Sequence, residues 1–197
     1  MLNPKIGKTL FLVPGFKQKA SDSYFGWLVN FLDLKGFKVV CVPIEWNYRT
    51  MSDYVNDFKE FYLKNKTDND YILGFSYGAV IAFITASELR PKKVYLCSLS
   101  SDFQEDVCDM KPWIQKMIGK KRMADIKKRS ARDIAKNLDI PLVIFFGEKE
   151  GEMYPQLKMR CEETAKLAKN SKLVVVKNAP HDISYSEYRE AIKKEFN

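Results

Sequence analysis

The sequence predicts a single α/β domain, a three-layer sandwich in which helices cover both faces of a mostly parallel sheet of about six strands. Short apolar, β-rich runs alternate with longer amphipathic ones along the 197 residues. Most of the short runs are apolar without interruption, as strands covered on both faces must be. The chain is 46% apolar and long enough to bury about 70% of the surface that its extended form would expose.

The expected elements follow one another in alternation. Strands are expected at residues 9–13, 38–42, 71–73, 93–98, 142–146 and 173–176. Helices are expected at residues 24–35, 51–65, 76–89, 154–170 and 184–196. Pro91 ends the third helix because a proline disfavours helix in the residue before it, and Gly36 and Asn170 are the expected stops of two others.

One connection is much longer than the rest, with about forty residues between the strands that end at 98 and begin at 142. A connection of this length carries structure of its own. Apolar residues recur in it at helical spacing, stop at Gly119 and then resume, which predicts two or three short helices. We expect a small lid inserted at about residues 100–139.

Positive charge is concentrated in the same connection. Residues 111–132 hold nine lysines and arginines and one acid, Asp125, a net charge of +8 that equals the charge of the whole chain. This basic segment is either a solvated helix face or a surface for an anionic substrate, a membrane or an acidic partner. No nucleic acid is expected as a partner, because aromatic residues are not interleaved with the basic ones and no nucleic-acid motif occurs.

Cysteine spacing and hydropathy indicate neither a metal site nor a membrane span. The four cysteines lack a Cys-x-x-Cys pair, and we expect no disulfide, metal or cofactor. The apolar run before Pro14 is too short for a signal-peptide core, and nowhere do 18 uncharged apolar residues follow one another. A soluble cytoplasmic protein is expected.

The most informative motif is Gly-Phe-Ser-Tyr-Gly at residues 74–78, between a predicted strand and a predicted helix. A serine with glycines two residues to either side, at a strand-to-helix corner, is typical of a nucleophile elbow. The glycines are needed because a side chain at either position would collide with the neighbouring strand or helix. Ser76 is therefore a candidate nucleophile.

A serine hydroxyl reacts only if a base removes its proton and a third group orients that base. The single histidine, His181, follows the last predicted strand, at the sheet edge where α/β sites gather. The third group should be a carboxylate that follows an intermediate strand. Glu148 and Glu150 both follow the strand at 142–146, within three residues of Gly147.

With these residues the chain resembles a small, esterase- or thioesterase-like member of the α/β-hydrolase superfamily, over nearly its whole length. The resemblance implies a minimal version of that fold, without the two leading strands of larger members. It implies Glu150 as the acid, three residues after Gly147, although the family more often has aspartate there. Asp102, after the preceding strand, is the alternative acid.

The resemblance also implies an oxyanion hole made of two backbone N–H groups. One belongs to Tyr77, the residue after the serine. The other belongs to Phe16, because the segment at residues 13–16 resembles the family's His-Gly-x segment with Pro14 in place of the histidine.

These residues predict a serine hydrolase that cleaves a small-molecule carboxylic ester or thioester through an acyl-enzyme on Ser76. Trp46 and Tyr48 follow a strand end and either line an acyl pocket or pack beneath the loops. The alternative is a catalytically silent, hydrolase-like interaction protein that binds an acidic partner through its basic lid. Turnover of a small ester that depends on Ser76 would exclude the alternative.

Overall fold

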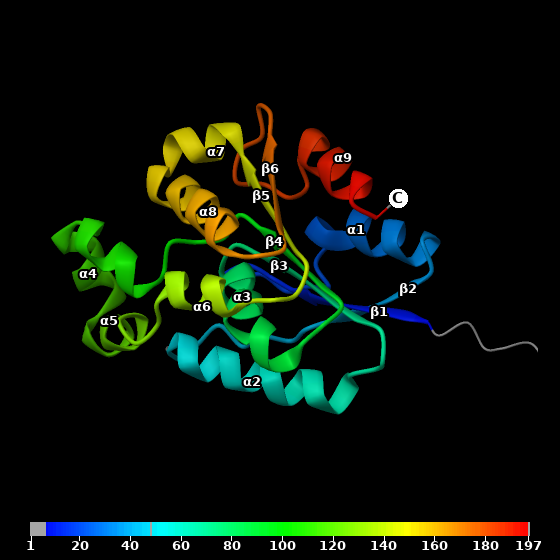
Figure 1. Ribbon diagram of the computed structural model, residues 1–197, viewed down its shortest axis with the longest axis horizontal. Helices are drawn as coiled ribbons and strands as arrows, with labels where there is room; N and C mark the ends of the chain where they lie inside the picture. Colours follow the sequence, from blue (N-terminus) through cyan, green and yellow to red (C-terminus); the bar gives the residue numbers. More distant parts are fainter. Residues whose placement is uncertain (1–6, 48, 197) are drawn as a thin grey trace, which may run out of the picture.

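A single parallel sheet lies at the centre of the molecule, with helices on both of its faces (Figure 1). The computed structural model describes residues 7–47 and 49–196. In this part of the chain the sheet has six strands in the order β2-β1-β3-β4-β5-β6, and every pair is parallel, which confirms the predicted architecture. The strands are β1 (Lys8–Val13), β2 (Phe37–Cys41), β3 (Asp70–Phe75), β4 (Lys93–Cys97), β5 (Leu142–Gly147) and β6 (Ser171–Val176).

Both faces of the sheet are buried because successive side chains of a strand point in opposite directions. In β1, Leu10 and Leu12 pack into one apolar cluster, and Phe11 and Val13 pack into the other. Helices α1 (Ser23–Leu34) and α9 (Ser186–Lys194) cover the first face, and α2 (Met51–Asn65), α3 (Tyr77–Leu89), α6 (Ala131–Asn137) and α8 (Pro155–Leu167) cover the second. No helix in the described residues combines the length and apolar character needed to cross a bilayer.

Local capping explains where two of the helices begin. Thr50 and Asp53 cap α2 reciprocally: the Asp53 N–H donates to the Thr50 side chain, and the Thr50 N–H donates to Asp53 Oδ2 at 2.8 Å. A helix not expected from the sequence, α7 (Glu148–Met153), directly follows β5. Its first turn is stabilised by the Gly147 N–H, which donates to Glu150 Oε2 at 2.8 Å, so a segment with an interior glycine is nevertheless helical.

The long connection between β4 and β5 contains the short helices that its pattern predicts. They are α4 (Pro112–Ile118), α5 (Lys120–Ile126) and α6, and a 3₁₀ turn that was not predicted, η1 (Gln104–Asp109), precedes them. Helix α4 has no buried residue, and it projects with α5 at the left of Figure 1. Gly119 separates the two at a φ of +87°, a conformation that favours glycine. Helix α6 instead buries Ala131 and Ala135 and belongs to the helical layer.

The strand order reverses between β1 and β3, since β2 lies on one side of β1 and all later strands lie on the other. Loops that leave neighbouring strands at such a point diverge to opposite faces and open a crevice at the carboxyl ends of the strands. The loop after β1 contains Pro14 and Gly15, and the turn after β3 contains Ser76. The topology therefore brings the predicted nucleophile and the predicted oxyanion loop to one edge of the sheet.

Candidate active site

Ser76 occupies a strained corner between β3 and α3. Its φ of 54° and ψ of −118° are unusual for a residue with a side chain, and its N–H donates to the Cys97 carbonyl at 2.8 Å. A Cβ on Gly74 would lie 2.3 Å from the Gly78 oxygen, and one on Gly78 would lie 2.2 Å from the Val13 oxygen. The predicted need for both glycines is confirmed, because backbone blocks the space that any side chain would take.

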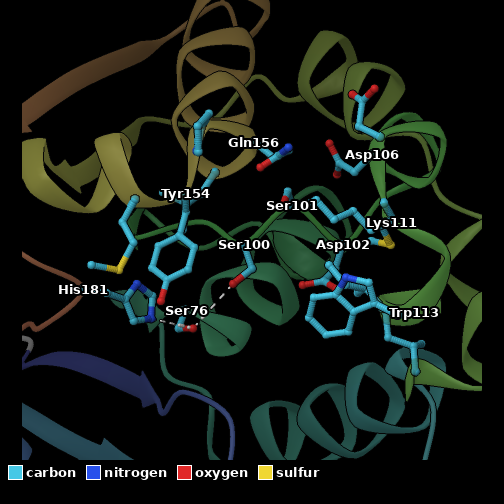
Figure 2. A pocket seen from close by; sticks show the side chains of 17 residues that line it. Ser76, Ser100, Ser101, Asp102, Asp106, Lys111, Trp113, Tyr154, Gln156 and His181 are labelled. Carbon is cyan, nitrogen blue, oxygen red and sulfur yellow. Dashed lines mark hydrogen bonds between the residues drawn. The ribbon is translucent and has the colours of Figure 1, made fainter. Parts of the chain in front are cut away.

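Three side chains predicted from the sequence meet at this corner. His181, on the loop after β6, has Nε2 3.1 Å from Ser76 Oγ (Figure 2). Its Nδ1 is hydrogen-bonded to Glu150 Oε1. The Phe75 ring lies 5.0 Å from the imidazole, between centroids, and supports one side of it. Serine, imidazole and carboxylate thus form a continuous hydrogen-bonded series from the ends of β3, β6 and β5.

The two carboxylates left open by the sequence occupy different environments. Glu150 is 1% exposed, and its Oε2 accepts hydrogen bonds from the Gly147 N–H at 2.8 Å and the Ser98 hydroxyl at 2.9 Å. Asp102 accepts a hydrogen bond from the Tyr77 hydroxyl at 3.4 Å. Glu150, not Asp102, is therefore the carboxylate hydrogen-bonded to His181.

The loop after β1 lies directly against the serine. A Cβ on Gly15 would be 3.3 Å from Ser76 Cβ, and the Gly15 N–H donates to Gln18 Oε1 at 3.1 Å. Tyr77 is the first residue of α3, a position whose N–H has no partner within the helix. The ring of Phe16, the next residue in the loop, is 5.5 Å from the Tyr77 ring. Both backbone segments predicted to supply oxyanion donors are thus neighbours of Ser76.

A cavity of about 630 Å³ opens above Ser76 and His181 (Figure 2). This volume is in the range of small-molecule sites. Its apolar wall comes from α4 on one side and the start of α8 on the other, and its polar wall comes from the segment after β4. The lining residues include Ser100, Ser101, Asp102, Asp106, Lys111, Trp113, Ile114, Ile118, Met153, Tyr154, Gln156 and Leu157.

The aromatic residues of this cavity differ from those expected from the sequence. Trp46 does not line it: the indole donates to the Gln18 carbonyl at 2.9 Å and packs 5.0 Å from the Tyr54 ring. Tyr48 lies outside the described residues. Trp113 and Tyr154 line the cavity instead, and Tyr154 is 6.3 Å from the His181 ring, between centroids. Neither residue has a local sequence signal for this role. Helix α4, which carries Trp113, lies over the sheet edge only in the folded chain, and Tyr154 reaches the cavity from between α7 and α8.

Asp102 carries an unusual protonation equilibrium. Burial, together with the nearby Asp106 carboxylate, raises the pKa of Asp102 to about 7 against the opposing hydrogen bond from Tyr77. In the unfolded chain the same carboxyl ionises near a pH of about 4. The free energy of unfolding therefore falls as pH rises between these two values, because the unfolded chain releases this proton first.

Asp102→Asn should accordingly change how stability depends on pH. As pH rises from 4 to 7, the unfolding free energy of the wild-type protein should fall by about 2 kcal/mol relative to that of the variant. This loss is smaller than the full linkage value because the Asp102 side chain partly faces the cavity. Above pH 7.5 the difference should stay constant. Urea unfolding of both proteins at several pH values measures it, and a pH-independent difference would contradict the assignment.

The basic segment at residues 111–132 is partly neutralised within the fold. Arg129 pairs with Asp125 at 3.0 Å, and Arg132 pairs with Glu163 at 2.7 Å. Among the residues that the structure describes, no cluster of three or more His, Cys, Asp or Glu side chains is arranged to hold a metal ion.

Solved structures with the same arrangement of elements are esterases and other α/β hydrolases. Est1E from Butyrivibrio proteoclasticus matches with a TM-score of 0.77 at 15% identity, over 99% of this chain and 87% of Est1E. The Pyrococcus furiosus esterase PF2001 matches with a TM-score of 0.70 at 16% identity, over 96% of this chain and 80% of the esterase. Mouse alpha/beta hydrolase domain-containing protein 10 matches with a TM-score of 0.70 at 11% identity, over 96% of this chain and 88% of the mouse protein.

No protein-family model matches the chain, and no curated protein is similar to it in sequence. At these low identities the structural matches establish the fold, which is that of the α/β hydrolases.

Proposed function

We propose that this chain, which has the α/β-hydrolase fold, is a serine hydrolase that cleaves a carboxylic ester or thioester through an acyl-enzyme on Ser76. The observation that carries the proposal is the hydrogen-bonded series from Ser76 Oγ through His181 to the buried Glu150 carboxylate. Nucleophile, base and orienting acid are in the chain order and the geometry that acyl transfer requires. A protein that only binds a partner needs none of these contacts.

The contacts support the following steps. The Glu150 carboxylate accepts a hydrogen bond from the Nδ1–H of His181, which leaves the lone pair of Nε2 toward Ser76 Oγ, 3.1 Å away. As Oγ attacks the ester carbonyl, Nε2 takes the hydroxyl proton, and the backbone N–H groups of Tyr77 and Phe16 stabilise the oxyanion. His181 then gives that proton to the departing alcohol or thiol, and an acyl-enzyme remains on Ser76.

Deacylation repeats these steps with water as the nucleophile. His181 Nε2 removes a proton from water, the hydroxide attacks the acyl carbon, and the carboxylic acid leaves as the proton returns to Ser76 Oγ. The net reaction is an ester or thioester plus water giving an acid plus an alcohol or thiol. It needs no cofactor.

The cavity favours a small ester with an apolar portion. Trp113 and Tyr154 provide flat surfaces, Ser100 provides a hydroxyl on the polar wall, and Gln156 adds a hydrogen-bonding group at the start of α8. Est1E, one of the similar structures, has also been solved with bound ferulic acid, an aromatic acid. An aromatic acyl ester therefore belongs beside short aliphatic esters and thioesters in any substrate panel.

Covalent labelling tests the proposal. A fluorophosphonate probe should modify the native protein at Ser76, and both Ser76→Ala and His181→Ala should remain unlabelled. Ser100→Ala is the matched control, because its hydroxyl lies 3.5 Å from Ser76 Oγ in the same cavity yet has no histidine partner among the described residues. Ser100→Ala should label like the wild type. A folded wild-type protein that stays unlabelled, or a label found on Ser100, would overturn the proposal.

A further inference from the structure

The Glu150 carboxylate is held by more than its bond to His181. Its second oxygen, Oε2, accepts from the Gly147 N–H and from the Ser98 hydroxyl, and Ser98 Oγ lies 2.9 Å from the Tyr188 hydroxyl. We propose that Ser98 and Tyr188 are positioning residues that act in series, Tyr188 through Ser98, to hold the Glu150 carboxylate in the orientation that aligns His181. The inference rests on the proposed function, since Glu150 is taken as the orienting acid of the same site.

The protons available on Ser98 and Tyr188 determine which group donates each hydrogen bond of the series. An ionised carboxylate only accepts hydrogen bonds, and a serine hydroxyl has a single proton to donate. A bond to a charged acceptor is about twice as strong as a neutral one, so the Ser98 proton goes to Glu150 Oε2. The Ser98 oxygen is then left as an acceptor for the Tyr188 hydroxyl, whose other contact, the Phe145 carbonyl, is longer at 3.3 Å.

Burial keeps this series in place. Ser98 and Tyr188 are both 0% exposed, so water does not compete for their hydroxyls. Burial raises the pKa of Tyr188 well above its ordinary value, which keeps the phenol protonated and able to donate. Ser98 has a φ of 58°, and its N–H donates to the Phe145 carbonyl at 2.7 Å. A non-glycine residue holds such a conformation only where its surroundings maintain it.

The series connects three elements around the acid. Ser98 follows β4, Glu150 lies in α7 and Tyr188 lies in α9, so the hydroxyls tie the C-terminal helix to the carboxylate through the end of the sheet. Two donors on Oε2 resist rotation of the carboxylate about its last side-chain bond. Oε1 therefore stays directed at His181 Nδ1, to which it is hydrogen-bonded.

Two single variants and their combination test the series. With a small ester as substrate, Ser98→Ala should lower kcat about tenfold with little change in KM, because a hydrogen bond to a charged group is lost away from the substrate. Tyr188→Phe should lower kcat about threefold. The double variant should be no slower than Ser98→Ala alone, because Tyr188 acts only through Ser98.

Two further variants separate positioning from general stability. Thr85→Val removes another buried hydroxyl, one that donates to the Ile81 carbonyl at 2.9 Å in α3, and it should leave kcat unchanged. Ser98→Gly also removes the hydroxyl and tolerates the positive φ, so it replaces Ser98→Ala if the alanine variant does not fold. Threonine is not a suitable substitute, since a β-branched residue is strained at that φ.

A second readout needs no substrate. His181 is the only histidine, so its Nδ1 proton gives one assignable imidazole signal in the proton NMR spectrum. That signal should move in Ser98→Ala and Tyr188→Phe and stay in place in Thr85→Val. If the fluorophosphonate test fails but the signal still moves in this pattern, the proposed function is wrong and the positioning series stands.

Other outcomes overturn the series itself. An unchanged kcat and an unmoved signal in Ser98→Ala would show that the hydroxyl does not position Glu150. Rate losses that multiply in the double variant would show that Tyr188 acts independently, as an ordinary core residue does.

Discussion

Replacing Glu150 by glutamine is expected to lower kcat/KM of ester hydrolysis about 10³- to 10⁴-fold while the protein remains folded. The amide can still accept a hydrogen bond from the Gly147 N–H, so helix α7 keeps its first-turn contact. The amide carries no charge to stabilise the imidazolium that forms on His181 in the transition state. Its NH₂ group cannot accept the hydrogen bond from Nδ1–H that orients the ring. Steady-state kinetics, with circular dichroism to verify folding, measures the loss.

Two acidic residues serve as controls for this variant. Glu148→Gln changes an exposed neighbour in the same helix whose carboxylate accepts from the Asn178 N–H at 3.0 Å. It should alter kcat/KM by less than about threefold, as surface substitutions generally have small effects. Asp102→Asn should retain most of the activity, because Asp102 accepts from Tyr77 and not from His181. An inactive Asp102→Asn beside an active Glu150→Gln would reverse the assignment of the acid.

The largest effect on stability is expected from Arg160→Leu. Arg160 and Asp106 form an ion pair with a shortest distance of 2.5 Å, and both side chains are 1% exposed. Removing the arginine leaves a buried carboxylate without its cation, which should cost about 3–5 kcal/mol of unfolding free energy at pH 7.5. Burial already raises the pKa of Asp106 against the opposing effect of Arg160, so the cost should shrink as pH falls and the carboxyl takes up a proton.

Arg132→Leu is the matched control for this loss. Both arginines bind Glu163, Arg160 Nη1 at 2.6 Å and Arg132 Nε at 2.7 Å, but the Arg132 side chain is 55% exposed. Its removal should cost less than about 1 kcal/mol, as is usual for surface pairs. Urea unfolding measures the loss of unfolding free energy in both variants and so compares a buried and an exposed arginine partner of Glu163. Equal losses would contradict the claim that burial gives the Arg160 pair its importance.

Much of the fold was predictable because its signals are local. The helix expected at residues 51–65 matches α2, since Thr50 and Asp53 cap its start within one turn. Helix α3 begins one residue later than expected, at Tyr77, because the strained backbone of Ser76 lies outside it. Helix α7 was not predicted, since a six-residue segment with Gly151 inside it has little helical preference of its own. Its stability depends on the contact between Glu150 and Gly147.

The sequence by itself determined the alternation of strands and helices, the elbow at Ser76 and the order of serine, acid and histidine, since each depends on residues that are close together in the chain or on their order. Only the tertiary structure decided that Glu150 and not Asp102 contacts His181, that Trp113 and Tyr154 line the cavity, and that Trp46 packs elsewhere. These contacts join residues on different strands and helices. Their distances follow from how the sheet and the long connection pack, which no local pattern of residues encodes.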